Sequence, residues 1–170
     1  MVGQPRLSNL VLLPAEVDTA RGVLRRLVEE SGADAALLLL RSGEIAVAES
    51  GPELAQVETL GALLAGNFAA AREIARLLGE TGFESQFQQG TTRQVVTQAV
   101  GDGWLLSVLF GPASALGMVK MLSARTATEL LPLNNAAQAR VARGEVPPGP
   151  GAAFKKAASG AIDALFGERG

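Results

Sequence analysis

The chain has 170 residues, 48% of them hydrophobic and 19% charged, and a formal net charge of -2, which suits one globular domain with a tail. It contains no histidine, cysteine or tyrosine, which excludes a thiol nucleophile, a histidine base, a serine triad of the usual kind and a Cys/His zinc site. No block of Lys and Arg favours nucleic acid and no apolar run could span a membrane, so we expect a cytoplasmic protein without either partner.

The first predicted helix begins at Pro14, a favoured first helical residue, and ends at Ser31-Gly32. After it, the stretch AALLLLRSGEIAVAES places two short apolar runs on either side of Ser42-Gly43, which is the pattern of a β-hairpin. The run from Leu37 to Leu40 does not alternate between apolar and polar residues. We therefore expect this strand to be covered on both faces.

A long second helix is predicted from about Leu54 to Leu78, followed by Gly79. Its helical wheel predicts a core stripe made of Leu60, Leu63, Leu64, Asn67, Ala71, Ile74 and Leu78. The opposite side carries small residues before any charge: Ala62, Ala65, Gly66 and Ala69, then Arg72, Glu73 and Arg76. A solvated helix face is normally charged, and an interior glycine costs about 1 kcal/mol relative to alanine. We interpret this side as a surface that another backbone approaches; the alternative is an exposed alanine run.

The apolar period then changes to two in FESQFQQG, TTRQVVTQAV and WLLSVLF, which predicts three strands separated by turns at Gly90 and at 101–103. Ser114 is expected to cap a third helix whose apolar residues are Leu116, Val119, Met121, Leu122 and Leu130. The order αββαβββα predicts an α/β (α+β) fold in which a five-stranded antiparallel sheet is sandwiched between helices.

Proline and glycine mark a division near the C-terminus, in the stretch VPPGPG. We predict a domain over residues 1–143, a linker over 144–151 and an amphipathic C-terminal helix over 152–170. The apolar side of that helix carries Phe154, Ile162, Leu165 and Phe166.

Motifs for catalysis do not occur in this sequence. The stretch GPASALGMVK differs from a phosphate loop in its glycine spacing and lacks the Lys-Ser/Thr pair that would follow. Glu29, Glu30 and Asp34 could form a carboxylate pair, but such clusters are more often solvated helix ends. We therefore expect no catalytic residue, metal site or cofactor, and a protein that is not an enzyme.

The block TLGALLAGNFAAAREIARLLGETGFESQFQQG, residues 59–90, resembles the Roadblock (dynein light-chain) family, and most of all its bacterial MglB-like members. The resemblance extends over roughly the whole chain. It implies a Roadblock/profilin-like fold with strand order 2-1-5-4-3, the second helix on one face and the other two helices on the opposite face.

The resemblance also implies a homodimer in which the second helices lie side by side and the third strands pair edge to edge. The strand from Phe83 to Gln88 has one charge, no proline and no lysine, so nothing in it blocks such pairing. The residues expected at this interface are Phe83, Glu84, Gln86, Phe87 and Gln88.

MglB-like dimers bind one small Ras-like GTPase of the MglA type on the paired second helices and speed its GTP hydrolysis, in cell polarity or motility. Carried over, this places the GTPase on Ala62, Ala65, Gly66, Ala69, Arg72, Glu73 and Arg76, with tail contacts from Phe154, Ile162, Leu165 and Phe166. Two other readings remain open: a scaffold or adaptor dimer of the same fold without effect on hydrolysis, and a profilin-shaped sensor of a small ligand. No polar residues converge to favour the sensor.

Overall fold

The computed structural model describes residues 12–50 and 56–145; most of the predicted linker and the whole predicted C-terminal helix lie outside the described residues. The elements are α1 (Pro14–Ser31), β1 (Ala35–Leu40), β2 (Ile45–Ser50), α2 (Val57–Leu77), β3 (Ser85–Gln89), β4 (Gln94–Val100), β5 (Trp104–Phe110) and α3 (Leu116–Ala142). The predicted order is confirmed. The third strand begins two residues later than predicted, because Phe83 and Glu84 belong to the segment that leads into it.

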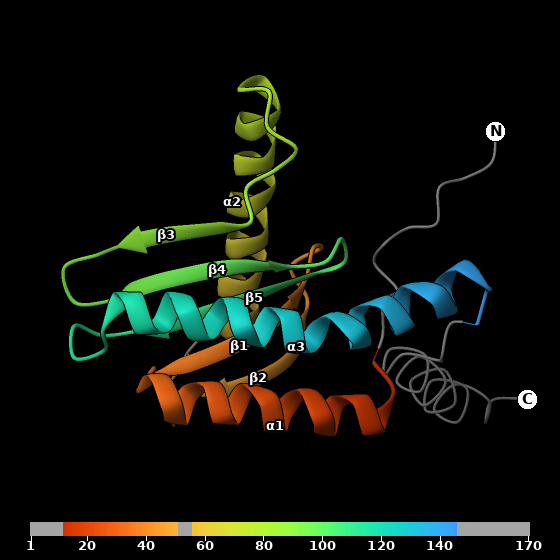
Figure 1. Cartoon of the computed structure of the whole chain (residues 1–170), viewed down its shortest axis with the longest axis horizontal. Helices are drawn as coiled ribbons and strands as arrows, with labels where there is room; N and C mark the ends of the chain where they lie inside the picture. The colour runs from red at the N-terminus through yellow and green to blue at the C-terminus, as the bar shows by residue number, and fades with distance from the viewer. Residues whose placement is uncertain (1–11, 51–55, 146–170) are drawn as a thin grey trace, which may run out of the picture.

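The five strands form one antiparallel sheet in the order β2-β1-β5-β4-β3, as expected. Figure 1 shows α1 and α3 lying along one face of this sheet, whereas α2 crosses the other face steeply. The sheet is therefore the middle layer of three, and α2 alone among the described helices covers its second face.

Strand β1 explains why the sheet needs cover on both sides. All six of its residues are buried, which confirms the expectation for this stretch. Leu38 and Leu40 pack into the core shared with α1 and α3, whereas Leu37 and Leu39 pack into the core beneath α2. Alternate side chains of one strand point to opposite faces, so a continuous apolar run supplies both cores.

Helix α3 packs beside α1 and is tied to it by ion pairs, among them Arg140 with Glu16. The predicted cap of α3 is wrong: its N-cap is Ala115, and the Ser114 hydroxyl instead donates to the carbonyl of Gly32 at 2.9 Å. This bond joins the start of α3 to the end of α1. Met121, one of the apolar residues of this helix, is 62% exposed.

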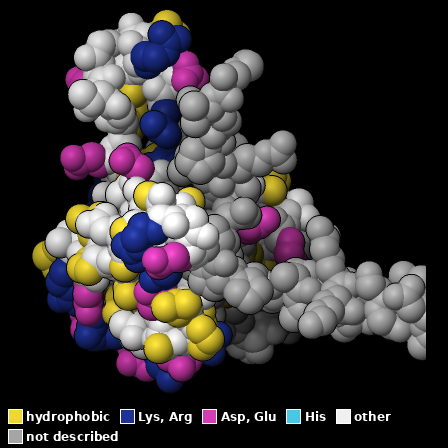
Figure 2. Space-filling model, turned by 90° about the vertical axis from the view of Figure 1, so that its right-hand side faces the viewer, with side chains coloured by type: hydrophobic (Ala, Val, Ile, Leu, Met, Phe, Trp, Pro, Cys, Tyr) yellow, Lys and Arg dark blue, Asp and Glu magenta, His cyan; other side chains and the backbone are white. Residues whose placement is uncertain are grey.

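Helix α2 begins against the β1–β2 turn and extends past β3, so its last turns project beyond the sheet (Figure 1). Figure 2 shows this projection rising above the body of the domain, with charged side chains of both signs scattered over the visible face. Within residues 12–50 and 56–145, no helix is long and apolar enough to cross a membrane, and no acidic cluster could hold a metal ion. The projecting end of α2 is therefore the most prominent feature of the domain surface in Figure 2.

Candidate functional site

The side of α2 that faces the sheet differs from the one predicted. Its buried residues are Gly61, Leu64, Ala65, Phe68, Ala71 and Ala75. Of the predicted core stripe, Leu64 and Ala71 are buried and Leu60 is partly buried, but the others are exposed: Leu63, Asn67, Ile74 and Leu78. The predicted stripe was therefore wrong in its rotation about the helix axis.

Close packing explains this rotation. Gly61 lies against the β1–β2 turn, where a Cβ atom would meet the carbonyl oxygen of Gly43 at 2.6 Å. Ala65, Ala71 and Ala75 continue the small side chains along the same side, and Phe68 fills the core between them. Small residues let a helix backbone approach its neighbour, and here that neighbour is the protein's own sheet.

Ala65 is consequently misplaced in the predicted GTPase platform, since it is only 4% exposed and packs beneath α2. The other predicted platform residues are exposed: Ala62, Gly66, Ala69, Arg72, Glu73 and Arg76. We call Ala62, Gly66 and Ala69 the small-residue edge of α2. It lies between the buried side and the side that faces solvent.

The side of α2 that faces solvent is apolar. Leu63, Ile74, Leu77 and Leu78 are 67%, 53%, 76% and 70% exposed. Together with Asn67 and Ala70, which are also exposed, they form what we call the α2 outer face. Exposed aliphatic side chains that share one helix face are typical of a protein interaction site. The sequence does contain a signal for this exposed apolar face, because residues 57–78 hold more apolar side chains than one helix side can bury.

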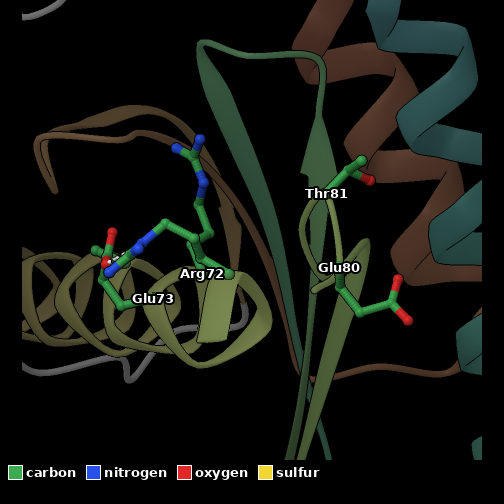
Figure 3. Close-up of a pocket in the computed structure, with 6 residues that line it drawn as sticks. Arg72, Glu73, Glu80 and Thr81 are labelled. Carbon is green, nitrogen blue, oxygen red and sulfur yellow. Dashed lines mark hydrogen bonds and ion pairs between the residues drawn. The ribbon is translucent and has the colours of Figure 1, made fainter. Parts of the chain in front are cut away.

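Beside the small-residue edge lies an open hollow of about 310 Å³, lined by Ala69, Arg72, Glu73, Arg76, Glu80 and Thr81. Figure 3 shows Arg72 and Glu73 on the helix and Glu80 and Thr81 on the segment opposite, with the Glu80 carboxylate directed away from Arg72. Arg76 donates from Nε to Glu73 at 3.0 Å, so these two charges compensate each other.

The predicted dimer residues lie at the other exposed feature, the edge of the sheet. Within the described residues β3 pairs with β4 and with no strand on its other side. Phe87 does not point outward along this edge, because its ring stacks on Phe110 with centroids 6.5 Å apart. Phe83 and Gln86 are partly buried, whereas Glu84 and Gln88 are exposed. The predicted tail contacts, residues 154–166, lie outside the part of the chain that the structure describes.

Across the described ranges, the pKa shifts concern Glu16, Arg26 and Arg41, each of which is engaged in ion pairs or hydrogen bonds to the protein itself. The exposed features of this region are an apolar helix face, a small-residue edge and the strand β3, whose outer edge is unpaired among the described residues.

Comparison with known proteins agrees with this architecture. The Roadblock/LC7 domain model matches residues 19–110. Similar solved structures include an MglB "with tetrameric arrangement" (32% identity, 75% of this chain and 96% of that chain, TM-score 0.72) and the gliding protein mglB of Thermus thermophilus (32%, 74% and 96%, 0.71). Myxococcus xanthus MglB is 26% identical over 69% of this chain and 96% of its own, with a TM-score of 0.66. A search of curated proteins found no match. The chain belongs to the Roadblock/LC7 domain family.

Proposed function

We propose that this protein is a homodimeric regulator that binds a small Ras-like GTPase of the MglA type on its α2 outer faces and stimulates GTP hydrolysis. It has no active site of its own, and its chemistry takes place in the partner. The observation that carries the proposal is the α2 outer face, on which four large aliphatic side chains are more than half exposed.

Covering this face with a partner is energetically favourable. Burial of one such aliphatic side chain is worth about 1.5–3 kcal/mol, although ordering and desolvation costs reduce the net gain. Leu77 and Leu78 lie at the projecting end of α2, which the sheet does not support (Figure 1). A projecting apolar helix end is accessible to a second protein from several directions.

The edge of the sheet supports dimerisation. Unpaired backbone groups along β3 can pair with the same strand of a second copy, and the segment 83–88 carries only one charge, at Glu84. Because α2 crosses the sheet and extends past β3, pairing at this edge would bring the two projecting helices near each other (Figure 1). Two outer faces then form one larger platform for a single GTPase.

The similar structures support the biological setting of the proposal. Two of them are MglB proteins 32% identical to this chain, one of them a gliding protein, and we extend motility and polarity to this protein on that basis. A cytoplasmic location follows from the same proposal, because a small Ras-like GTPase acts there. The tetrameric arrangement of one relative favours the alternative function of an assembly scaffold.

The test mixes the full-length protein with a purified MglA-type GTPase and GTP, and follows phosphate release while light scattering reports the mass. We expect a mass of two chains for the protein alone, a complex with the GTPase, and faster phosphate release. Leu77→Asp should abolish the complex, because it places a charge within the apolar contact.

Met121→Asp is the matched control. Met121 is also a large exposed apolar side chain, 62% exposed, but it lies on α3 across the sheet. This variant should bind like the wild type. A complex that forms without faster phosphate release would instead indicate the scaffold function, and no complex at all would refute the proposal.

A further inference from the structure

Arg41, immediately after β1, is held in a fixed position next to α2. Its Nε donates to the carbonyl of Asp102 at 2.5 Å, and Nη2 donates to the carbonyl of Gly101 at 3.0 Å. The guanidinium also lies over the ring of Phe68, 5.7 Å from its centroid. These contacts use part of the guanidinium and leave its remaining N–H groups oriented but without a protein acceptor among the described residues.

Arg72 lies one helical turn after Phe68 and therefore on the same side of α2. Arg41 and Arg72 line one hollow of about 180 Å³, together with Phe68, Thr81 and the β4–β5 turn. In the described ranges Arg72 forms no ion pair, in contrast to Arg76 one turn later, which is paired with Glu73. Two guanidinium groups from separate elements thus face one small space.

The two positive charges repel each other. Burial lowers the pKa of Arg41, the charge of Arg72 lowers it further, and Asp102 opposes this shift. An arginine side chain carries a positive charge throughout the pH range of folded proteins, so the repulsion persists. Glu84 and Asp102 also line the hollow, but neither lies within ion-pair distance of either arginine. A bound anion would relieve this repulsion.

We propose that this hollow, the Arg41–Arg72 site, receives one carboxylate from an acidic side chain of the protein docked on α2, where that protein reaches past the small-residue edge. The inference rests on the proposed function and adds the chemistry of one contact to it. A hollow of 180 Å³ accommodates a single side-chain group, and two guanidinium planes suit the bidentate geometry of a carboxylate.

The location of the site favours a protein carboxylate over a free anion. The hollow shares Arg72 and Thr81 with the larger hollow beside the small-residue edge, so the site adjoins that edge, on the flank of α2 away from the outer face. Arginine is one of the residue types enriched among the side chains that carry most of the binding energy in protein interfaces. The partner should therefore carry an aspartate or glutamate beside the surface that covers the small-residue edge.

The first experiment tests the site without any partner. Acetate is titrated into the full-length protein while NMR follows the Nε–Hε signals of the arginines. In the wild type we expect saturable shifts of the Arg41 and Arg72 signals. In Arg72→Ala the Arg41 signal should no longer show a saturable shift. The control, Arg25→Ala, removes an exposed arginine that pairs with Glu49 on the other face of the sheet, and should leave the shifts unchanged. Linear shifts shared by all arginines would overturn the site.

The second experiment tests the source of the carboxylate, using GTPase affinity as a function of salt. Arg72→Ala should weaken binding about tenfold and reduce its salt dependence, as expected when a charged interface pair is lost. Arg25→Ala should change neither. If Arg72→Ala binds like the wild type, the carboxylate does not come from the docked GTPase. If the wild type binds no GTPase, both the proposed function and the GTPase as source of the carboxylate are refuted. Saturable acetate binding would still establish the Arg41–Arg72 site.

Discussion

The backbone of α2 meets the β1–β2 turn at Gly61, where an added Cβ atom would lie 2.6 Å from the carbonyl oxygen of Gly43. The contact is tight from both sides, since a Cβ atom on Gly43 would lie 2.7 Å from the Cα atom of Ala62. Gly43 also has a φ of 97°, which side chains rarely adopt. This pair of glycines fixes how close α2 lies to the sheet and which side of it faces outward.

Replacing Gly61 should therefore destabilise the protein even though alanine is the better helix former. We expect Gly61→Ala to lower the free energy of unfolding by about 1–3 kcal/mol, because the backbone must move to admit the methyl group. Gly66→Ala is the control in the same helix. Nothing lies within 4 Å of its Cβ position, so it should raise stability by up to about 1 kcal/mol. Urea unfolding measures both, and an equal stabilisation by the two alanines would contradict the close contact.

Arginine substitutions at two alanines distinguish the buried side of α2 from the small-residue edge. Ala65→Arg should unfold the protein or cost more than about 3 kcal/mol, since it forces a charge into the core beneath α2. Ala69→Arg, one turn later and exposed, should change stability by less than about 0.5 kcal/mol. Thermal unfolding followed by circular dichroism measures the difference.

The same pair is informative for binding. Ala69→Arg should weaken or abolish association with the GTPase, because a long charged side chain prevents close approach to the small-residue edge. Titration calorimetry with the folded variant measures this. Wild-type affinity in that variant would move the docking site away from this edge.

Stimulation of hydrolysis should not depend on an arginine supplied to the GTPase active site. An arginine finger is worth about 10³–10⁵ in rate. Arg72 and Arg76 lie on a regular helix, and Arg76 is paired with Glu73, so neither has the reach of a loop residue. We expect Arg72→Ala and Arg76→Ala to keep the maximal rate of phosphate release, at saturating protein, within a few-fold of wild type. A loss of two orders of magnitude with binding unchanged would falsify this.

The ion pair between Glu16 and Arg140 predicts a pH dependence of stability. The Glu16 carboxylate accepts hydrogen bonds from Nη1 and Nη2 of Arg140 at 2.8 and 2.7 Å and from the backbone N–H of Leu13 at 2.8 Å. Burial alone would raise the pKa of Glu16, but these bonds and the charge of Arg140 lower it below the ordinary value. A group with a lowered folded pKa stabilises the protein above its unfolded pKa and loses that contribution as pH falls through the folded value.

Glu16→Gln should accordingly be less stable than the wild type at pH 7, by about 1.5–3 kcal/mol, a magnitude typical of hydrogen bonds to charged groups. The difference should shrink as pH falls below about 4.3, the ordinary pKa of glutamate, because the wild type then protonates. Urea unfolding of both proteins between pH 7 and pH 3 gives this difference directly. A gap that stays constant over the whole range would show that Glu16 acts through packing.

Local signals were sufficient to predict most of the fold. Pro14 and Gly32 bound α1, and the turns at Gly43 and Gly101 mark hairpins, because each of these residues sets the backbone at its own position. The rotation of α2 could not be obtained in this way. Both sides of the helix near residues 60–71 are apolar or small, so periodicity permits two solutions, and the contact of Gly61 with a distant turn decides between them.

The sequence predicts the candidate site only in part, because the rotation of α2 is ambiguous. The residues of the small-residue edge could be found on a helical wheel, but the outer face was mistaken for core. Arg41 gave no signal at all. Its partners are the carbonyls of Gly101 and Asp102 and the ring of Phe68, which are far from it in sequence and meet it only in the folded domain.

The position of β1 between β2 and β5 also determines when the domain can form during synthesis. β1 pairs with β2 nearby, but its other neighbour is β5, which ends at Phe110, and α1 packs against α3, which follows β5. In a nascent chain that has not yet extended past Phe110, the six residues of β1, all buried in the folded domain, lack the strand β5 that pairs with them. The ribosome must therefore release most of the domain before its centre closes, and until then this apolar strand is exposed to chaperones and to neighbouring chains.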